Sequence, residues 1–173
     1  MPDASTRLPS AAAQSRLLAG SGVLFGLGLG GFFDGIVLHQ LLQWHHMVSS
    51  WYPTTTLENL RLNTLWDGIF HSTTYVFVVL AVYLFWKASR RQPFAASGRL
   101  MVGTALVGWG LFNVLEGTVD HEILGIHHVN ERVASGDFVY WDIGFLIWGL
   151  LMAVGGWRLY DTSRRAHAHS GTA

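Results

Sequence analysis

Four stretches of the chain are apolar with few interruptions, at residues 17–38, 65–86, 100–119 and 138–157. Each is close to the ~20 residues that an α-helix needs to cross a ~30 Å hydrocarbon layer. The pattern therefore predicts an all-α, polytopic membrane protein, a four-helix bundle formed by one transmembrane domain over residues 1–161. Residues 162–173 are predicted to form a cytoplasmic tail.

Polar residues interrupt this pattern twice in the same way. The chain has HQLLQWHH at residues 39–46 and HEILGIHH at residues 121–128. An acid followed by a glycine precedes each segment at the same distance, beginning at Asp34 and at Glu116. We therefore expect two pseudo-symmetric helical hairpins, related by a pseudo-twofold axis along the membrane normal.

Three segments resemble a family of small bacterial four-helix integral membrane proteins of unknown function. They are FFDGIVLHQLLQWHH, WDGIFH and NVLEGTVDHEILGIHH. The resemblance extends over nearly the whole chain and implies the same membrane architecture, in the bacterial inner membrane. It implies no activity, so the chemistry has to be inferred from the residues themselves.

The distribution of charge predicts how the chain is oriented. Of the eleven Lys and Arg residues, all but Arg61 and Arg132 precede the first apolar stretch, join the second to the third, or follow the fourth. By the positive-inside rule both termini are expected in the cytoplasm and the histidine-rich ends outside. The formal net charge of zero does not favour binding to nucleic acid. The absence of cysteine excludes a thiolate metal site.

Helical geometry predicts where the polar side chains gather. At 100° per residue, Asp34, His39 and His45 share one face of their helix, within an arc of about 140°. Counting ~1.5 Å per residue from the nearest cytoplasmic cation gives the depth of each ionisable group. The pattern predicts a polar funnel in the outer leaflet with paired histidines at its mouth. The groups that fall at one depth, about 24–27 Å, are Asp34, His71, Glu116 and Asp142.

Acids and histidines at one depth favour a bound cation. A charge at the bilayer centre costs roughly 2.5–3.5 kcal/mol, and carboxylates cannot neutralise one another. Imidazole and carboxylate ligands without sulfur suit a transition metal such as copper, iron or zinc. The predicted metal ligands are His39, His71, His121, Asp34, Asp67 and Glu116. The predicted surrounding residues are Asp120 and Asp142, which would orient imidazoles, and His45, His46, His127 and His128, which would admit the metal.

Several functions are compatible with this prediction. One is metal handling with a donor or acceptor protein of the cell envelope, and another is metal-dependent redox chemistry on a lipid-soluble substrate. Haem held between His39 and His121 in an electron-transfer protein is an alternative cofactor. A further alternative is a non-catalytic protein in which the polar residues form a hydrogen-bonded network between helices. The Gly-rich first stretch permits close helix contacts and, in the lipid bilayer, an oligomer.

Overall fold

The computed structural model describes residues 9–90 and 98–170, with side chains up to Arg165. All regular structure in this part of the chain is helical. In the first half, α1 (Ala11–Phe33) runs directly into the π-helical segment η2 (Asp34–Leu41), and α2 spans Leu57–Ser89. In the second half, α3 (Gly98–Glu116) runs into the π-helical segment η3 (Gly117–Ile123), and a 3₁₀ turn, η4 (Ser135–Asp137), leads into α4 (Phe138–Ser170).

Four segments are long and apolar enough to cross a membrane, namely Ala11–Leu41, Leu57–Ser89, Gly98–Ile123 and Ser135–Arg165. The predicted all-α membrane protein with four spans is therefore confirmed, and each helical segment is longer than the apolar stretch that predicted it. Because α4 extends to Ser170, the predicted tail begins as a continuation of the helix. The orientation of the chain stays a prediction.

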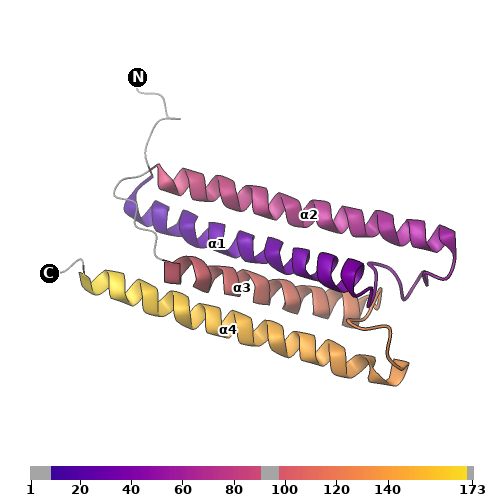
Figure 1. Cartoon of the computed structure of the whole chain (residues 1–173). Helices are drawn as coiled ribbons and strands as arrows, with labels where there is room; N and C mark the ends of the chain where they lie inside the picture. Colours follow the sequence, from indigo (N-terminus) through magenta and orange to yellow (C-terminus); the bar gives the residue numbers. More distant parts are fainter. Residues whose placement is uncertain (1–8, 91–97, 171–173) are drawn as a thin grey trace.

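The helices lie side by side in the order α2, α1, α3, α4 (Figure 1). Among the described residues, α1 packs against α2 and α3, α3 also packs against α4, and the outer helices α2 and α4 do not touch. The outer helices expose large apolar side chains such as Tyr75, Val82 and Leu151, which suits contact with lipid tails. A pseudo-twofold relation between the two hairpins stays a prediction.

Glycine lets α1 and α3 approach to backbone contact. A Cβ atom on Gly26 would lie 1.9 Å from the Ala105 carbonyl oxygen, and one on Gly108 would lie 2.0 Å from the Val23 carbonyl oxygen. No side chain fits at these distances, so only glycine permits the observed packing. The close helix contacts expected from the Gly-rich first stretch are confirmed at this interface.

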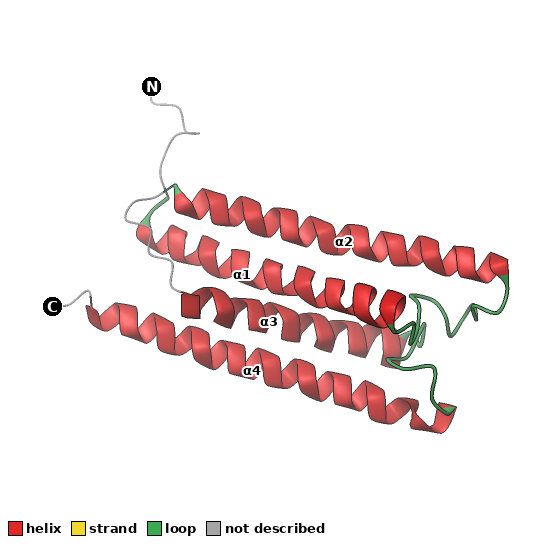
Figure 2. Ribbon diagram, viewed as in Figure 1, coloured by secondary structure: helices red, strands yellow, loops and turns green. Residues whose placement is uncertain are grey.

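The two π-helical segments end at the same end of the molecule, where the loops that follow them lie together (Figures 1 and 2). These loops are joined by backbone hydrogen bonds. The Ser50 N–H donates to the Ile126 carbonyl, and the Glu131 N–H donates to the Trp44 carbonyl, each at 3.0 Å. The loop of each hairpin is therefore fixed against the loop of the other.

Candidate metal centre

The acid and the first histidine are five positions apart in each half, Asp34 from His39 and Glu116 from His121. In an α-helix this spacing puts two side chains about 140° apart, as the sequence analysis expected. The chain instead forms π-helix here, and its i to i+5 hydrogen bonds bring residues five apart onto one side. His39 Nε2 lies 2.9 Å from Asp34 Oδ2, and His121 Nε2 lies 2.9 Å from Glu116 Oε1.

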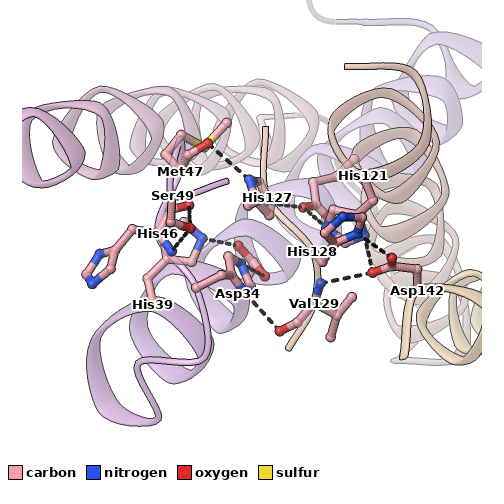
Figure 3. Close-up of polar contacts among 12 residues, drawn as sticks. Asp34, His39, His46, Met47, Ser49, His121, His127, His128, Val129 and Asp142 are labelled. Atoms are coloured by element: carbon pink, nitrogen blue, oxygen red, sulfur yellow. Dashed lines mark hydrogen bonds and ion pairs between the residues drawn. The ribbon is translucent and has the colours of Figure 1, made fainter. Parts of the chain in front are cut away.

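Four imidazoles converge between the two hairpins. His39 and His121 come from η2 and η3, His45 and His127 come from the loops that follow, and all four residues are at most 3% exposed. The rings of His45 and His127 are parallel with centroids 4.4 Å apart, His39 lies 4.5 Å from His45, and His121 lies 4.9 Å from His127. The close-up shows His39, His121 and His127 gathered with Asp34 (Figure 3). We call this set of four histidines with Asp34 and Glu116 the central cluster.

The two loop histidines are oriented by the backbone of the opposite hairpin. His45 Nδ1–H donates to the Val129 carbonyl at 2.9 Å, and His127 Nδ1–H donates to the Met47 carbonyl at 3.0 Å. Because a carbonyl only accepts, the proton is on Nδ1 and each ring presents Nε2 to the cluster. Burial, with repulsion from the adjacent His127, lowers the pKa of His45 to about 4. His45 is therefore unprotonated at Nε2 near neutral pH, which is the form that binds a metal.

Asp67 and Asp142 make matching contacts in the two halves. Each carboxylate lies close to the Nδ1 atoms of two histidines and accepts a backbone N–H from the loop. For Asp67 these partners are His39 at 2.8 Å, His46 at 2.6 Å and the Met47 N–H at 2.9 Å. For Asp142 they are His121 at 3.3 Å, His128 at 2.7 Å and the Val129 N–H at 2.9 Å, the latter two visible in Figure 3. Sequence reasoning expected Asp67 to be a ligand and Asp142 to be an orienting residue, whereas both carboxylates occupy the orienting position.

The inward-facing atoms of the cluster lack hydrogen bonds. Among the described residues, Nε2 of His39, His45 and His121 and Oε2 of Glu116 are buried without a hydrogen-bond partner. The 2.9 Å contacts of His39 and His121 with their acids are short but lack the direction of a hydrogen bond. Ligand atoms bound ~2.0–2.2 Å from one metal ion lie about 2.8–3.6 Å apart at right or tetrahedral angles. The separations therefore resemble those of neighbouring ligands in one coordination shell.

The contact between His127 and Glu116 brings two acceptor atoms together. His127 Nδ1–H is committed to the Met47 carbonyl, yet Nε2 of the same ring lies 2.9 Å from Glu116 Oε1. A bare nitrogen and a carboxylate oxygen are both acceptors, so a proton or a metal ion must lie between them. His121 Nε2 contacts the same oxygen. One carboxylate oxygen is thus shared by two imidazoles.

Two groups of three buried residues have potential ligand atoms within 4.8 Å of one another. One group is His39, His45 and His127, and the other is Glu116, His121 and His127. Asp34 borders the first group, since its carboxylate lies 2.9 Å from His39 Nε2 and 3.7 Å from His45 Nε2. Because the groups share His127, two metal positions would be neighbours.

The placement of the paired histidines corrects the sequence analysis. His45 and His127 are buried at the centre of the cluster and do not lie at a mouth. Only His46 and His128 face outward, with side chains 18% and 29% exposed. The reason is that the loops fold back over the cluster, where the buried acids of α2 and α4 accept their backbone N–H groups.

His71 belongs to neither group of potential ligands. Its ring stacks on that of Phe32, with centroids 6.3 Å apart. The ring also packs against Gly35 so closely that a Cβ atom on this glycine would lie 2.4 Å from His71 Nε2. In the second half Leu146 packs against Gly117 in the corresponding place. His71 thus fills the position of an apolar packing residue, which argues against the predicted role as a ligand.

Asp120 was expected to orient an imidazole, but in the described part of the chain its carboxylate forms no hydrogen bond to one. The orienting groups that sequence reasoning missed are the carbonyls of Met47 and Val129. Backbone acceptors leave little trace in a sequence. The available signal was that an apolar residue directly follows each His-His pair in both halves.

A family model described as "Predicted membrane protein (DUF2243)" matches residues 21–163. The chain therefore belongs to this family, in agreement with the resemblance found in the sequence. Neither the comparison with curated proteins nor the comparison with solved structures gave a match. The matched range contains the whole central cluster together with Asp67 and Asp142.

Proposed function

We propose that this member of the family binds one or two transition-metal ions, copper, iron or zinc, in the central cluster. The proposed ligands are His39, His45, His121, His127, Asp34 and Glu116. Asp67 and Asp142 would orient two of the imidazoles. The observation that carries the proposal is that the buried Nε2 atoms of His39 and His45 have no hydrogen-bond partner while the Nδ1 atom of each ring is held by an oxygen.

The charge and the chemistry of the cluster support a metal ion. Two buried carboxylates need compensating positive charge, because an uncompensated charge costs several kcal/mol away from water. A divalent ion would neutralise both. Histidines that bind metals usually hold their second ring nitrogen against a carboxylate or a carbonyl, and both kinds of partner are present here. Nitrogen and oxygen donors without sulfur suit copper(II), iron and zinc.

The surroundings of the cluster favour metal handling at one membrane face. On the side away from the loops, α1 and α3 are in backbone contact at Gly26 and Gly108, which leaves no path between them there. At the loop end, the partly exposed side chains of His46 and His128 lie next to the buried histidines. The ion would therefore enter and leave at the loop end, as in a protein that exchanges metal with an envelope donor or acceptor protein.

Haem is less well supported as a cofactor. Axial ligation by His39 and His121 requires the two rings to face each other across a flat macrocycle. The rings of His45 and His127 occupy the space between them, with successive centroids 4.4–4.9 Å apart. A macrocycle would have to displace both rings and would then lie against two carboxylates.

A second candidate function is metal-dependent redox chemistry on a lipid-soluble substrate. It is favoured by an apolar cavity of about 380 Å³ between η2 and α4, within the size range of small-molecule sites. Leu38, Val129 and Phe145 line this cavity, and the Phe145 ring lies 5.6 Å from that of His121. A substrate bound there should change the absorption spectrum of a bound copper or iron ion. A panel of quinones and fatty acids that leaves the spectrum unchanged would argue for metal handling.

The proposal is tested by the metal content of detergent-purified protein, measured by elemental analysis with an absorption spectrum of the same sample. We expect about one or two ions per chain in the parent. His127→Ala removes the residue that the two groups of potential ligands share. It should bind metal at least ten-fold more weakly, which is the usual size of the loss when a ligand or its support is removed. His128→Ala, the neighbouring residue, is the matched control and should keep its metal at equilibrium.

Three results would overturn the proposal. A parent protein that stays metal-free after exposure to copper, iron and zinc ions would favour a structural polar network. A Soret band would favour haem. Equal metal content in the two variants would remove His127 from the site and with it the link between the two groups.

A further inference from the structure

Asp120, the residue of η3 directly before His121, differs from the other acids around the central cluster. Asp34, Asp67, Glu116 and Asp142 each lie within hydrogen-bonding distance of at least one imidazole. Asp120 is half-buried, and within the described residues its carboxylate forms neither a hydrogen bond nor an ion pair. An unpartnered acid in a membrane-spanning segment is costly and therefore indicates a functional position.

The Asp120 carboxylate is nevertheless close to the cluster. It directly precedes His121 in η3 and lies four positions, about one helical turn, after Glu116. Its charge interacts with those of Glu116, His121 and His127, which are the second group of potential ligands. Because Asp120 is only half-buried, it stands between this group and the surroundings of the protein.

The first half of the chain has a different residue at the matching position. Leu38, directly before His39, is 5% exposed and belongs to an apolar core with Phe112, Val129 and Phe145. That side of the cluster is therefore lined with apolar side chains, whereas the side at Asp120 presents a carboxylate without a hydrogen bond. The asymmetry indicates that the ion, entering at the loop end, reaches the cluster on the side of the second hairpin.

We propose that Asp120 is the exchange ligand through which a divalent transition-metal ion enters and leaves the cluster, an inference that rests on the proposed metal binding. The carboxylate binds the hydrated ion by replacing one water molecule, and the ion then passes to Glu116, His121 and His127. As the ion takes its place, the proton between His127 Nε2 and Glu116 is released to water. Asp120 then returns to its unpartnered state, outside the final ligand shell.

An exchange ligand speeds both the association and the dissociation of the ion and leaves the equilibrium affinity nearly unchanged. A single negative charge at the entrance raises the local concentration of cations, so its loss should slow binding, and the effect should weaken as salt screens it. A permanent ligand behaves differently, because its loss weakens the equilibrium affinity.

The test compares the full-length, detergent-purified metal-free protein with three variants, using Co²⁺ as a spectroscopic probe in stopped-flow absorption. Asp120→Asn keeps the size and removes the charge. We expect its association and dissociation rates to fall about ten-fold while the dissociation constant stays within about three-fold. Asp120→Glu keeps a carboxylate and should load near the parental rate. Glu122→Gln removes the charge of an exposed acid two residues away and is the matched control.

The outcomes separate this inference from the proposed function. Failure of the parent to bind Co²⁺ or Zn²⁺ would refute the metal site itself. If the parent binds and Asp120→Asn loads at the parental rate, Asp120 has no exchange role. Weaker affinity at an unchanged association rate would make Asp120 a permanent ligand. If Glu122→Gln slows binding equally, the effect comes from the negative electrostatic potential of the surface and not from Asp120 itself. Each of the last three results overturns the inference and leaves the metal site intact.

Discussion

Replacing Gly26 with alanine tests whether the contact between α1 and α3 sets the geometry of the central cluster. The new Cβ atom would lie 1.9 Å from the Ala105 carbonyl oxygen, so the two backbones would have to separate by about 1.5 Å to reach van der Waals contact. Overpacking of this kind costs about 1–3 kcal/mol. Because α1 continues into η2 and α3 into η3, the separation would also move Asp34 away from Glu116.

Metal sites tolerate ligand displacements of only about 0.2 Å, so we expect metal binding at least about ten-fold weaker as well as a lower melting temperature. The assay is thermal unfolding of detergent-purified protein followed by circular dichroism, with metal affinity measured by competition against a chelator.

Gly155→Ala is the matched control, because its added Cβ atom meets nothing within 4 Å. It should melt at or above the parental temperature, since alanine favours helix over glycine by up to about 1 kcal/mol. A Gly26→Ala protein with the parental melting temperature and the parental metal affinity would refute the reasoning that links the α1–α3 contact to the spacing of the ligands.

Three further predictions concern individual side chains. Changing Asp67 or Asp142 to asparagine should weaken metal affinity by about 10–100-fold without changing the number of ions bound, because each carboxylate orients an imidazole. Isothermal titration calorimetry measures both quantities, and an unchanged affinity would contradict the orienting role. His71→Leu, which copies the residue of the second half, should keep its metal and its melting temperature, and loss of metal by elemental analysis would place His71 among the ligands. Single cysteines at Ser50 and Ser135 should react with a membrane-impermeant thiol reagent in intact cells whose outer membrane has been made permeable, and labelling only after lysis would reverse the predicted orientation.

Part of the candidate site is predictable from the sequence. The repeated acid and histidine pattern identifies Asp34, His39, Glu116 and His121 as proposed ligands, because an internal repeat of costly polar residues in apolar segments is visible without coordinates. His45 and His127 are also conspicuous in the sequence, but sequence reasoning placed them at the mouth. Their depth depends on how the loops fold back, and no local pattern specifies that.

The sequence by itself determined that the chain has four membrane-spanning helices, because the length and apolarity needed to cross a bilayer belong to each segment alone. Only the tertiary structure decided how the polar residues meet. Asp34 reaches His39 because the end of the first helix is wound as π-helix. His45 and His127 turn inward because each donates to a carbonyl of the opposite hairpin. These contacts join residues 80 and 84 positions apart, so they form only once the hairpins have packed together, and helical periodicity along one segment cannot reveal them.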